Sequence, residues 1–152
     1  MSKIITVFGN LLENVHTGHI VHGANAQGVM GSGFAKSLKD MYPAAFQDYS
    51  DIYTDEGLEL GDAYPFCPST ELVIWNAITQ EWFGQPGRNC SYDAIQTCFE
   101  SINNAVVGFD AVEQHIHIPL LGAGLGGGNW EIIREIIEQT TTVPVTLWRL
   151  QP

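Results

Sequence analysis

The chain has 152 residues, a length typical of one domain (residues 1–152) with a single sizeable core. Its 17 Asp and Glu residues against six Lys and Arg residues give a net charge of −11, which disfavours polymeric nucleic acid as a partner because phosphates require a basic surface. There is no apolar run of membrane-spanning length, no signal-peptide pattern and no metal-ligand spacing of the cysteines, so we expect a cytoplasmic protein with reduced thiols and no membrane partner.

Strand-like and helix-like segments alternate along the whole chain. In order, the pattern predicts strands at 4–8 and 19–24, helices at 34–41 and 44–53, strands at 63–67 and 72–77, a helix from 91 to about 107, a strand at 112–120, a helix at 130–139 and a strand at 145–150. Ser91 and Asn129 are the expected N-caps of the last two helices. This order indicates an α/β protein with a mixed sheet between layers of helices, in which ligands bind at the carboxyl ends of strands.

Two glycine-rich loops, each placed between an expected strand and an expected helix, are the most informative feature. The first follows the strand at 19–24 and contains Gly28, Gly31 and Gly33, and the second spans 122–128. Glycine lets a backbone turn tightly and approach a ligand, and a helix N-terminus adds N–H groups that bind anions. Three successive glycines at 126–128 are more than packing alone should need. The sequence therefore predicts a ligand with more than one phosphate or ribose, held mainly by backbone N–H groups because cations are few.

Familiar nucleotide motifs do not account for these loops. Neither loop ends in the Gly-Lys-Ser/Thr of a phosphate-binding P-loop. The second loop matches G-x-G-x-x-G formally at Gly122, Gly124 and Gly127, but a loop this rich in glycine matches many patterns, and it lies too near the end of the chain for a dinucleotide-binding half. A nicotinamide dehydrogenase is therefore not expected.

The two loops and the segments beside them resemble a macrodomain, the ADP-ribose-binding fold, over almost the whole chain. The matching segments are 9–12, 22–25, 28–35, 119–131 and 145–150. The likeness is greatest to the branch that contains ADP-ribose-1″-phosphate phosphatases and small ADP-ribosyl hydrolases. It implies a three-layer α/β/α fold with a mixed central sheet, ADP-ribose or ADP-ribose-1″-phosphate as the small-molecule partner, and no cofactor.

The resemblance also implies roles for individual residues. Asn10 matches a side chain that recognises adenine, Asn25 matches the asparagine at the distal ribose, and His22 matches a histidine beside the terminal group in the phosphatases. The full set of expected ligand-binding residues is Asn10, Leu11, Asn25, Gly28, Met30, Gly31, Ser32, Gly33, Gly122, Ala123, Gly124, Leu125, Gly126 and Leu150. Simpler roles are open for three of them: Asn10 as a turn residue, Asn25 as the end of a strand in an Asx turn, and His22 as an interior histidine.

Two departures from the hydrolase members narrow the expected activity. Gln80 stands where those enzymes carry a lysine after the threonine, and the second loop contains no acid. We therefore expect an ADP-ribose-1″-phosphate phosphatase with His22 and Asn25 as catalytic residues, since His22 alone in the matched loops has an ordinary pKa near neutrality. A non-catalytic ADP-ribose reader and a hydrolase acting on a protein or nucleic-acid adduct are the alternatives. His115 and His117 share a strand face without a third ligand, so no metal is expected, and the sequence indicates no oligomeric state.

Overall fold

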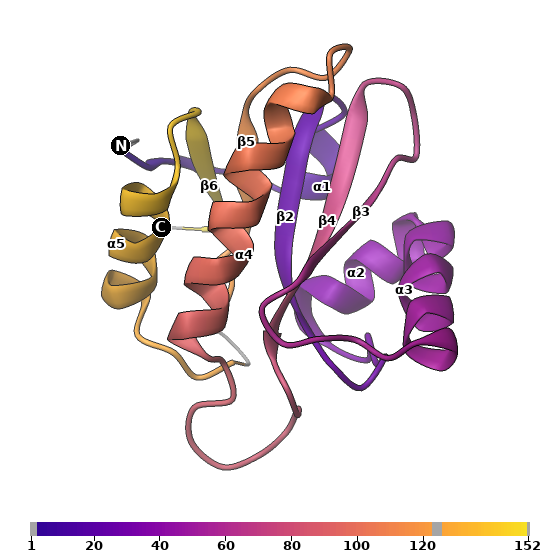
Figure 1. Cartoon of the computed structure of the whole chain (residues 1–152). Helices are drawn as coiled ribbons and strands as arrows, with labels where there is room; N and C mark the ends of the chain where they lie inside the picture. The colour runs from indigo at the N-terminus through magenta and orange to yellow at the C-terminus, as the bar shows by residue number, and fades with distance from the viewer. Residues whose placement is uncertain (1–2, 123–125, 152) are drawn as a thin grey trace.

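A six-stranded sheet runs through the computed structural model, which describes residues 3–122 and 126–151 (Figure 1). In chain order, the elements are β1 (Ile5–Phe8), α1 (Leu11–Asn14), β2 (Gly18–Asn25), α2 (Gly33–Met41), α3 (Pro43–Asp55), β3 (Ala63–Phe66), β4 (Leu72–Gln80), α4 (Tyr92–Ala105), a 3₁₀ turn (Val106–Gly108), β5 (Ile116–Ile118), α5 (Trp130–Thr140) and β6 (Val145–Arg149). The strand order is β1-β6-β5-β2-β4-β3.

The strand directions bring several loops to one edge of the sheet. Neighbouring strands run parallel from β1 across to β4, and β3 alone pairs antiparallel, with β4. The carboxyl ends of β2, β4 and β5 therefore meet at the same edge, and β2 lies between the other two. Both glycine-rich loops leave the sheet there, because the first follows β2 and the second follows β5.

Two layers of helices cover the sheet, and each closes its own part of the core. Alternate residues of β2 and β4 point to opposite faces. Val21 and Val73 pack with α4 and α5, whereas Ile20 and Ile74 pack with α1, α2 and α3. Figure 1 shows α4 and α5 on one side of the sheet and α2 and α3 on the other. The expected α/β/α architecture with a mixed sheet is confirmed.

The elements agree with the sequence pattern except at three places. Ser91 caps α4 by accepting from the Ala94 N–H, and Asn129 caps α5 by accepting from the Glu131 N–H, as expected. The strand expected at 112–120 is shorter, since its first residues form turns before β5 begins at Ile116. Strand β4 continues to Gln80, beyond the expected end at residue 77. The short helix α1 was not expected at all.

The described part of the chain contains neither a disulfide, nor a cluster of metal-ligating side chains, nor a helix that could span a membrane. Cys67, Cys90 and Cys98 are free thiols. The rings of His115 and His117 stack with centroids 4.2 Å apart, and no group of three or more metal-ligating side chains forms among residues 3–122 and 126–151. Within the same residues, no helix is both long and apolar enough to cross a bilayer.

Candidate functional site

A cavity of about 620 Å³ lies at the carboxyl edge of the sheet, where the two glycine-rich loops emerge. Its walls come from the ends of β2, β4 and β5, the start of α2, and the loop that follows β4, which extends at the lower end of the molecule in Figure 1. A smaller hollow of about 360 Å³ lies between α4 and α5, on the outer surface and away from both loops. The larger cavity is the candidate site, because it collects the loops and buried polar groups.

The N-terminus of α2 faces this cavity with its backbone donors available. The first N–H groups of an α-helix have no acceptor within the helix. Ser32 occupies the N-cap position but its side chain makes no capping bond, and the first turn carries no acidic residue. Gly33, Phe34 and Ala35 line the cavity. The partial positive charge of this helix end therefore favours an anionic group of a ligand, such as a phosphate.

Asn25 closes the first loop with its side chain. Its Oδ1 accepts from the Gln27 N–H at 3.0 Å and from the Val29 N–H at 3.3 Å, and its Nδ2 donates to the Val29 carbonyl at 2.8 Å. The buried Tyr49 hydroxyl donates to the Asn25 backbone carbonyl at 2.5 Å and lies 3.0 Å from Oδ1. The side chain thus forms an Asx turn that shapes the loop, and its second amide hydrogen remains to contact a ligand.

His22 lies in the wall of the cavity and is almost completely buried, with 1% of its surface exposed. Its Nε2 is 2.5 Å from Oδ1 of Asn76 on β4; because Oδ1 can only accept, Nε2 carries the hydrogen and Nδ1 carries a lone pair. Nδ1 has no hydrogen-bond partner among the described residues. Burial lowers the pKa of His22 to about 4, against the opposing effect of the Asn76 bond, so the ring is neutral at pH 7.

Thr79 adds a second unpartnered polar group to the cavity wall. It is 1% exposed, and its hydroxyl oxygen has no partner in the described residues. A Cβ on Gly23 would lie 2.8 Å from that oxygen, so glycine is needed on the neighbouring strand for close packing. Gln80, at the position where the resembling hydrolases carry lysine, donates from Nε2 to the Trp82 carbonyl at 2.7 Å. Its amide therefore holds the following loop.

Gly126, Gly127 and Gly128 of the second loop are needed for packing, which corrects the expectation that three glycines in succession exceed what packing needs. A Cβ on Gly126 would lie 2.6 Å from the Gly122 carbonyl oxygen, one on Gly127 2.7 Å from the Gly87 carbonyl oxygen, and one on Gly128 2.6 Å from Cys90 Sγ. The described end of the loop therefore packs against Gly122 and against the segment before α4. The expected ligand residues Ala123, Gly124 and Leu125 lie outside the described residues.

The other expected ligand residues divide between the cavity wall and its surroundings. The cavity is lined by Asn25, Gly31, Ser32, Gly33, Gly122 and Gly126. Leu11 and Met30 are buried in the core beneath α1 to α3, Gly28 packs against the Tyr53 ring, and Leu150 is exposed beyond β6. Asn10 caps α1, where its Oδ1 accepts from the Glu13 N–H at 3.2 Å. These five residues do not line the cavity itself.

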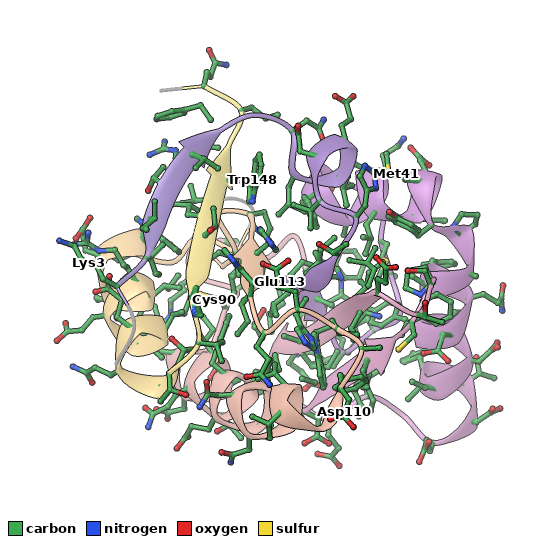
Figure 2. All side chains as sticks on the ribbon, turned by 90° about the horizontal axis from the view of Figure 1, so that it is seen from above. Lys3, Met41, Cys90, Asp110, Glu113 and Trp148 are labelled. Atoms are coloured by element: carbon green, nitrogen blue, oxygen red, sulfur yellow. The ribbon has the colours of Figure 1, made fainter. Side chains whose placement is uncertain are left out.

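The indole of Trp148, on β6, covers the turn that precedes Asn10. Trp148 lies on the side of β6 that faces away from α5 (Figure 2) and packs with the core beneath α1. Its Nε1 donates to His117 Nδ1 at 3.0 Å, and a Cβ on Gly9 would lie 3.3 Å from its ring. The turn before Asn10 is therefore packed against this indole.

Asn76, Thr79 and Tyr49 are the site residues that sequence reasoning missed. Asn76 and Thr79 are the two polar residues in the fully buried part of β4, LVIWNAITQ, and their presence among apolar residues was a usable signal for the site. Tyr49 lies on α3, and nothing in the local sequence indicated that its hydroxyl reaches Asn25. Phe83 and Gly84, in the loop after β4, also line the cavity.

Comparison with known proteins gives a consistent family match. A family model described as "Macro domain" matches residues 21–137. An uncharacterised 17.5 kDa protein of Enterobacteria phage T4 is 29% identical over 126 residues, which is 79% of this chain and 77% of that protein. An ADP-ribose 1″-phosphate phosphatase of Neosartorya fischeri is 44% identical over 48 residues, which is 32% of this chain. The chain spans only 24% of that phosphatase.

Solved structures show the same fold over nearly the whole chain. A protein of unknown function from Bacteroides thetaiotaomicron superposes with a TM-score of 0.88 at 25% identity, covering 98% of this chain and 99% of that one. Thermosipho africanus DarTG in complex with ADP-ribose superposes with a TM-score of 0.81 at 19% identity, covering 97% of this chain and 42% of that one.

Proposed function

Because this chain belongs to the Macro domain family, we propose that the cavity at the carboxyl edge of its sheet binds ADP-ribose. The observation that carries the proposal is the meeting of both glycine-rich loops and the uncapped N-terminus of α2 in one cavity. A diphosphate placed there is held by backbone N–H groups and by the helix dipole, as suits a chain with six basic residues. The complex of a structural relative with ADP-ribose supports the same ligand.

The distal ribose then lies toward Asn25, and the adenine toward Asn10 and the exposed Leu150. Asn25 offers its second amide hydrogen, and the Asx turn fixes the direction of the side chain. Asn10 already uses Oδ1 for the N-cap of α1, so its contact to adenine relies on the second lone pair of that oxygen.

A phosphatase activity on ADP-ribose-1″-phosphate is the catalytic proposal, with His22 and Asn25 as its residues. It is supported by the short match to the fungal phosphatase and by the unpartnered Nδ1 of His22 in the cavity wall. A neutral imidazole with this lone pair accepts a proton or attacks phosphorus, and it does not serve as a general acid at pH 7. Water supplies the new oxygen on phosphorus and the proton on the 1″ oxygen, the bond between phosphorus and the 1″ oxygen breaks, and inorganic phosphate and ADP-ribose are the products.

One pair of assays tests binding and catalysis separately. Calorimetry with ADP-ribose measures binding, and release of inorganic phosphate from ADP-ribose-1″-phosphate measures turnover. We expect His22→Gln to abolish phosphate release, while His16→Gln, which replaces an exposed histidine after α1, leaves it unchanged. Circular dichroism and retained ADP-ribose binding establish that the buried variant is folded.

The outcomes separate the proposal from its alternatives. Binding of ADP-ribose without phosphate release above the His22→Gln background supports a non-catalytic reader. Release of ADP-ribose from a protein or nucleic-acid adduct, without phosphatase activity, supports the hydrolase alternative. Absence of ADP-ribose binding by the folded native chain contradicts the proposed function as a whole.

A further inference from the structure

Four exposed apolar side chains form a collar beside the mouth of the cavity. They are Val29 in the first loop, Tyr53 at the end of α3, and Trp82 and Phe83 after β4, with exposed fractions of 39%, 42%, 58% and 47%. Val29 and Phe83 also line the cavity, whereas Trp82 does not. Exposed apolar groups gathered beside a ligand cavity mark a surface that contacts something larger than the ligand in the cavity.

Specific contacts hold the collar together. Gln27 Nε2 donates to the Glu81 carbonyl at 3.0 Å, which ties the first loop to the segment that carries Trp82. Gly28 packs so closely on Tyr53 that a Cβ there would lie 2.9 Å from the ring. Gln80 donates to the Trp82 carbonyl at 2.7 Å. The collar is therefore formed by loops that are fixed to one another, which lowers the entropic cost of docking a partner.

The outer side of the collar is acidic. The segment before β3 is hydrogen-bonded to the end of β4, with the Gly61 N–H on the Ile78 carbonyl and the Ile78 N–H on the Asp62 carbonyl, both at 2.8 Å. Ile78 is three residues before Glu81, which follows the end of β4, so the segment lies beside the part of the chain that leads into Glu81. We call the exposed carboxylates here the acidic flank; they are Glu56, Glu59, Asp62 and Glu81.

Arg88, the basic residue of the loop between β4 and α4, contacts an aromatic ring at the start of α4. The guanidinium of Arg88 lies 4.1 Å from the centre of the Tyr92 ring, at the start of α4. Aromatic rings and carboxylates together favour a cation, above all the planar guanidinium of arginine, which stacks on aromatic faces and pairs with carboxylates. A polyanionic partner is disfavoured by the acidic flank and by the net charge of −11.

We infer that the collar and the acidic flank dock an arginine-containing, basic protein segment that carries ADP-ribose, while the ADP-ribose occupies the cavity. The inference rests on the proposed function for the cavity, and it adds the class of carrier. An arginine beside the modified residue stacks on Trp82 and pairs with Glu81, and the apolar stem of its side chain covers Phe83.

Calorimetry with three conjugates tests the inference. Each carries ADP-ribose through the same non-hydrolysable linkage: on a peptide with flanking arginines, on the same peptide with serines in their place, and on a short oligonucleotide. We expect the arginine conjugate to bind about tenfold more tightly than free ADP-ribose, and the serine conjugate to bind like free ADP-ribose. Trp82→Ala and Glu81→Gln should each remove most of the gain and leave binding of free ADP-ribose unchanged.

Ile132→Ala is the matched control, because Ile132 is also an exposed apolar residue, at 43% against 58% for Trp82, and lies on α5, outside the collar. It should keep the full gain. Equal binding of the arginine and serine conjugates, or tighter binding of the oligonucleotide, overturns the inference while leaving ADP-ribose binding in place. If the native chain does not bind free ADP-ribose, that result contradicts the proposed function of the cavity and not the inference about the carrier.

Discussion

The burial of His22 makes a quantitative prediction about stability against pH. The imidazole projects from β2, is almost completely buried and is hydrogen-bonded to Asn76 on β4, and burial lowers its pKa from 6.5 to about 4. Above pH 6.5 the ring is neutral in both the folded and the unfolded chain, so the full contribution of the neutral ring to stability is present. As the pH falls from 6.5 toward 4, the unfolded chain takes up a proton that the folded chain rejects, and stability is lost.

The interval between a pKa of 6.5 and one of about 4, at roughly 1.4 kcal/mol per pH unit, amounts to about 3 kcal/mol for this one group. Below pH 4 the ring is protonated in both states, and no further loss comes from it. His19 and His117 also have pKa values lowered by burial to about 4, so they add to the slope of the native chain. A comparison with His22→Gln isolates the share of His22.

The assay is urea denaturation of the native chain and of His22→Gln at a series of pH values between 7 and 4. Between pH 6.5 and pH 4, we expect the free energy of unfolding of the native chain to fall by about 1.4 kcal/mol more per pH unit than that of the variant. We expect the His22 ring to titrate near pH 4 by NMR. Parallel stability curves for the two proteins, or a ring titration near 6.5, would refute the buried, neutral state from which the role of His22 as proton acceptor or nucleophile is argued.

Three further predictions concern the cavity wall and its electrostatics. Gly23→Ala should destabilise the chain by about 1 to 3 kcal/mol in thermal or urea unfolding, because its Cβ meets the Thr79 hydroxyl at 2.8 Å, and Thr79→Ala in the same chain should recover most of the loss; absence of recovery would place the clash elsewhere. Tyr49→Phe should cost about 1 to 2 kcal/mol and weaken ADP-ribose binding by calorimetry, because the Asn25 carbonyl loses a buried donor; unchanged affinity would show that Asn25 does not position the ligand. Binding of ADP-ribose should vary little between low and moderate salt, and Arg88→Ala should not change that slope, since fixed backbone donors in a cavity are screened less than surface ion pairs; a steep slope that disappears in Arg88→Ala would refute recognition by the backbone.

The fold could be predicted because its signals are local. Ser91 and Asn129 stand immediately before amphipathic runs, and each caps a helix. The strand that became β2 is bounded by turn signals and followed by glycines. Helix α1 was missed because it has four residues, too few for a periodic pattern, and depends on Asn10 and on packing of Leu11 in the core. Strand β5 is short because the chain before it turns to meet β2, a tertiary effect.

The site was only partly predictable, because its geometry joins residues that are distant in the chain. The loops were visible as glycine patterns, but the reasons for the individual glycines were not. Gly127 and Gly128 are needed because the segment at Gly87 to Cys90 packs against them, a contact that no local pattern reveals. In the same way, the polar partner of His22 comes from β4, 54 residues further along the chain.

A crystal structure with bound ADP-ribose tests the central proposal most directly. We expect the diphosphate within hydrogen-bond distance of the backbone N–H groups at the start of α2, and the distal ribose within reach of the Asn25 amide. Tyr53, Trp82 and the hollow between α4 and α5 should be free of the nucleotide. ADP-ribose in that hollow, or a diphosphate held by arginine side chains away from α2, would contradict the proposed function of the cavity.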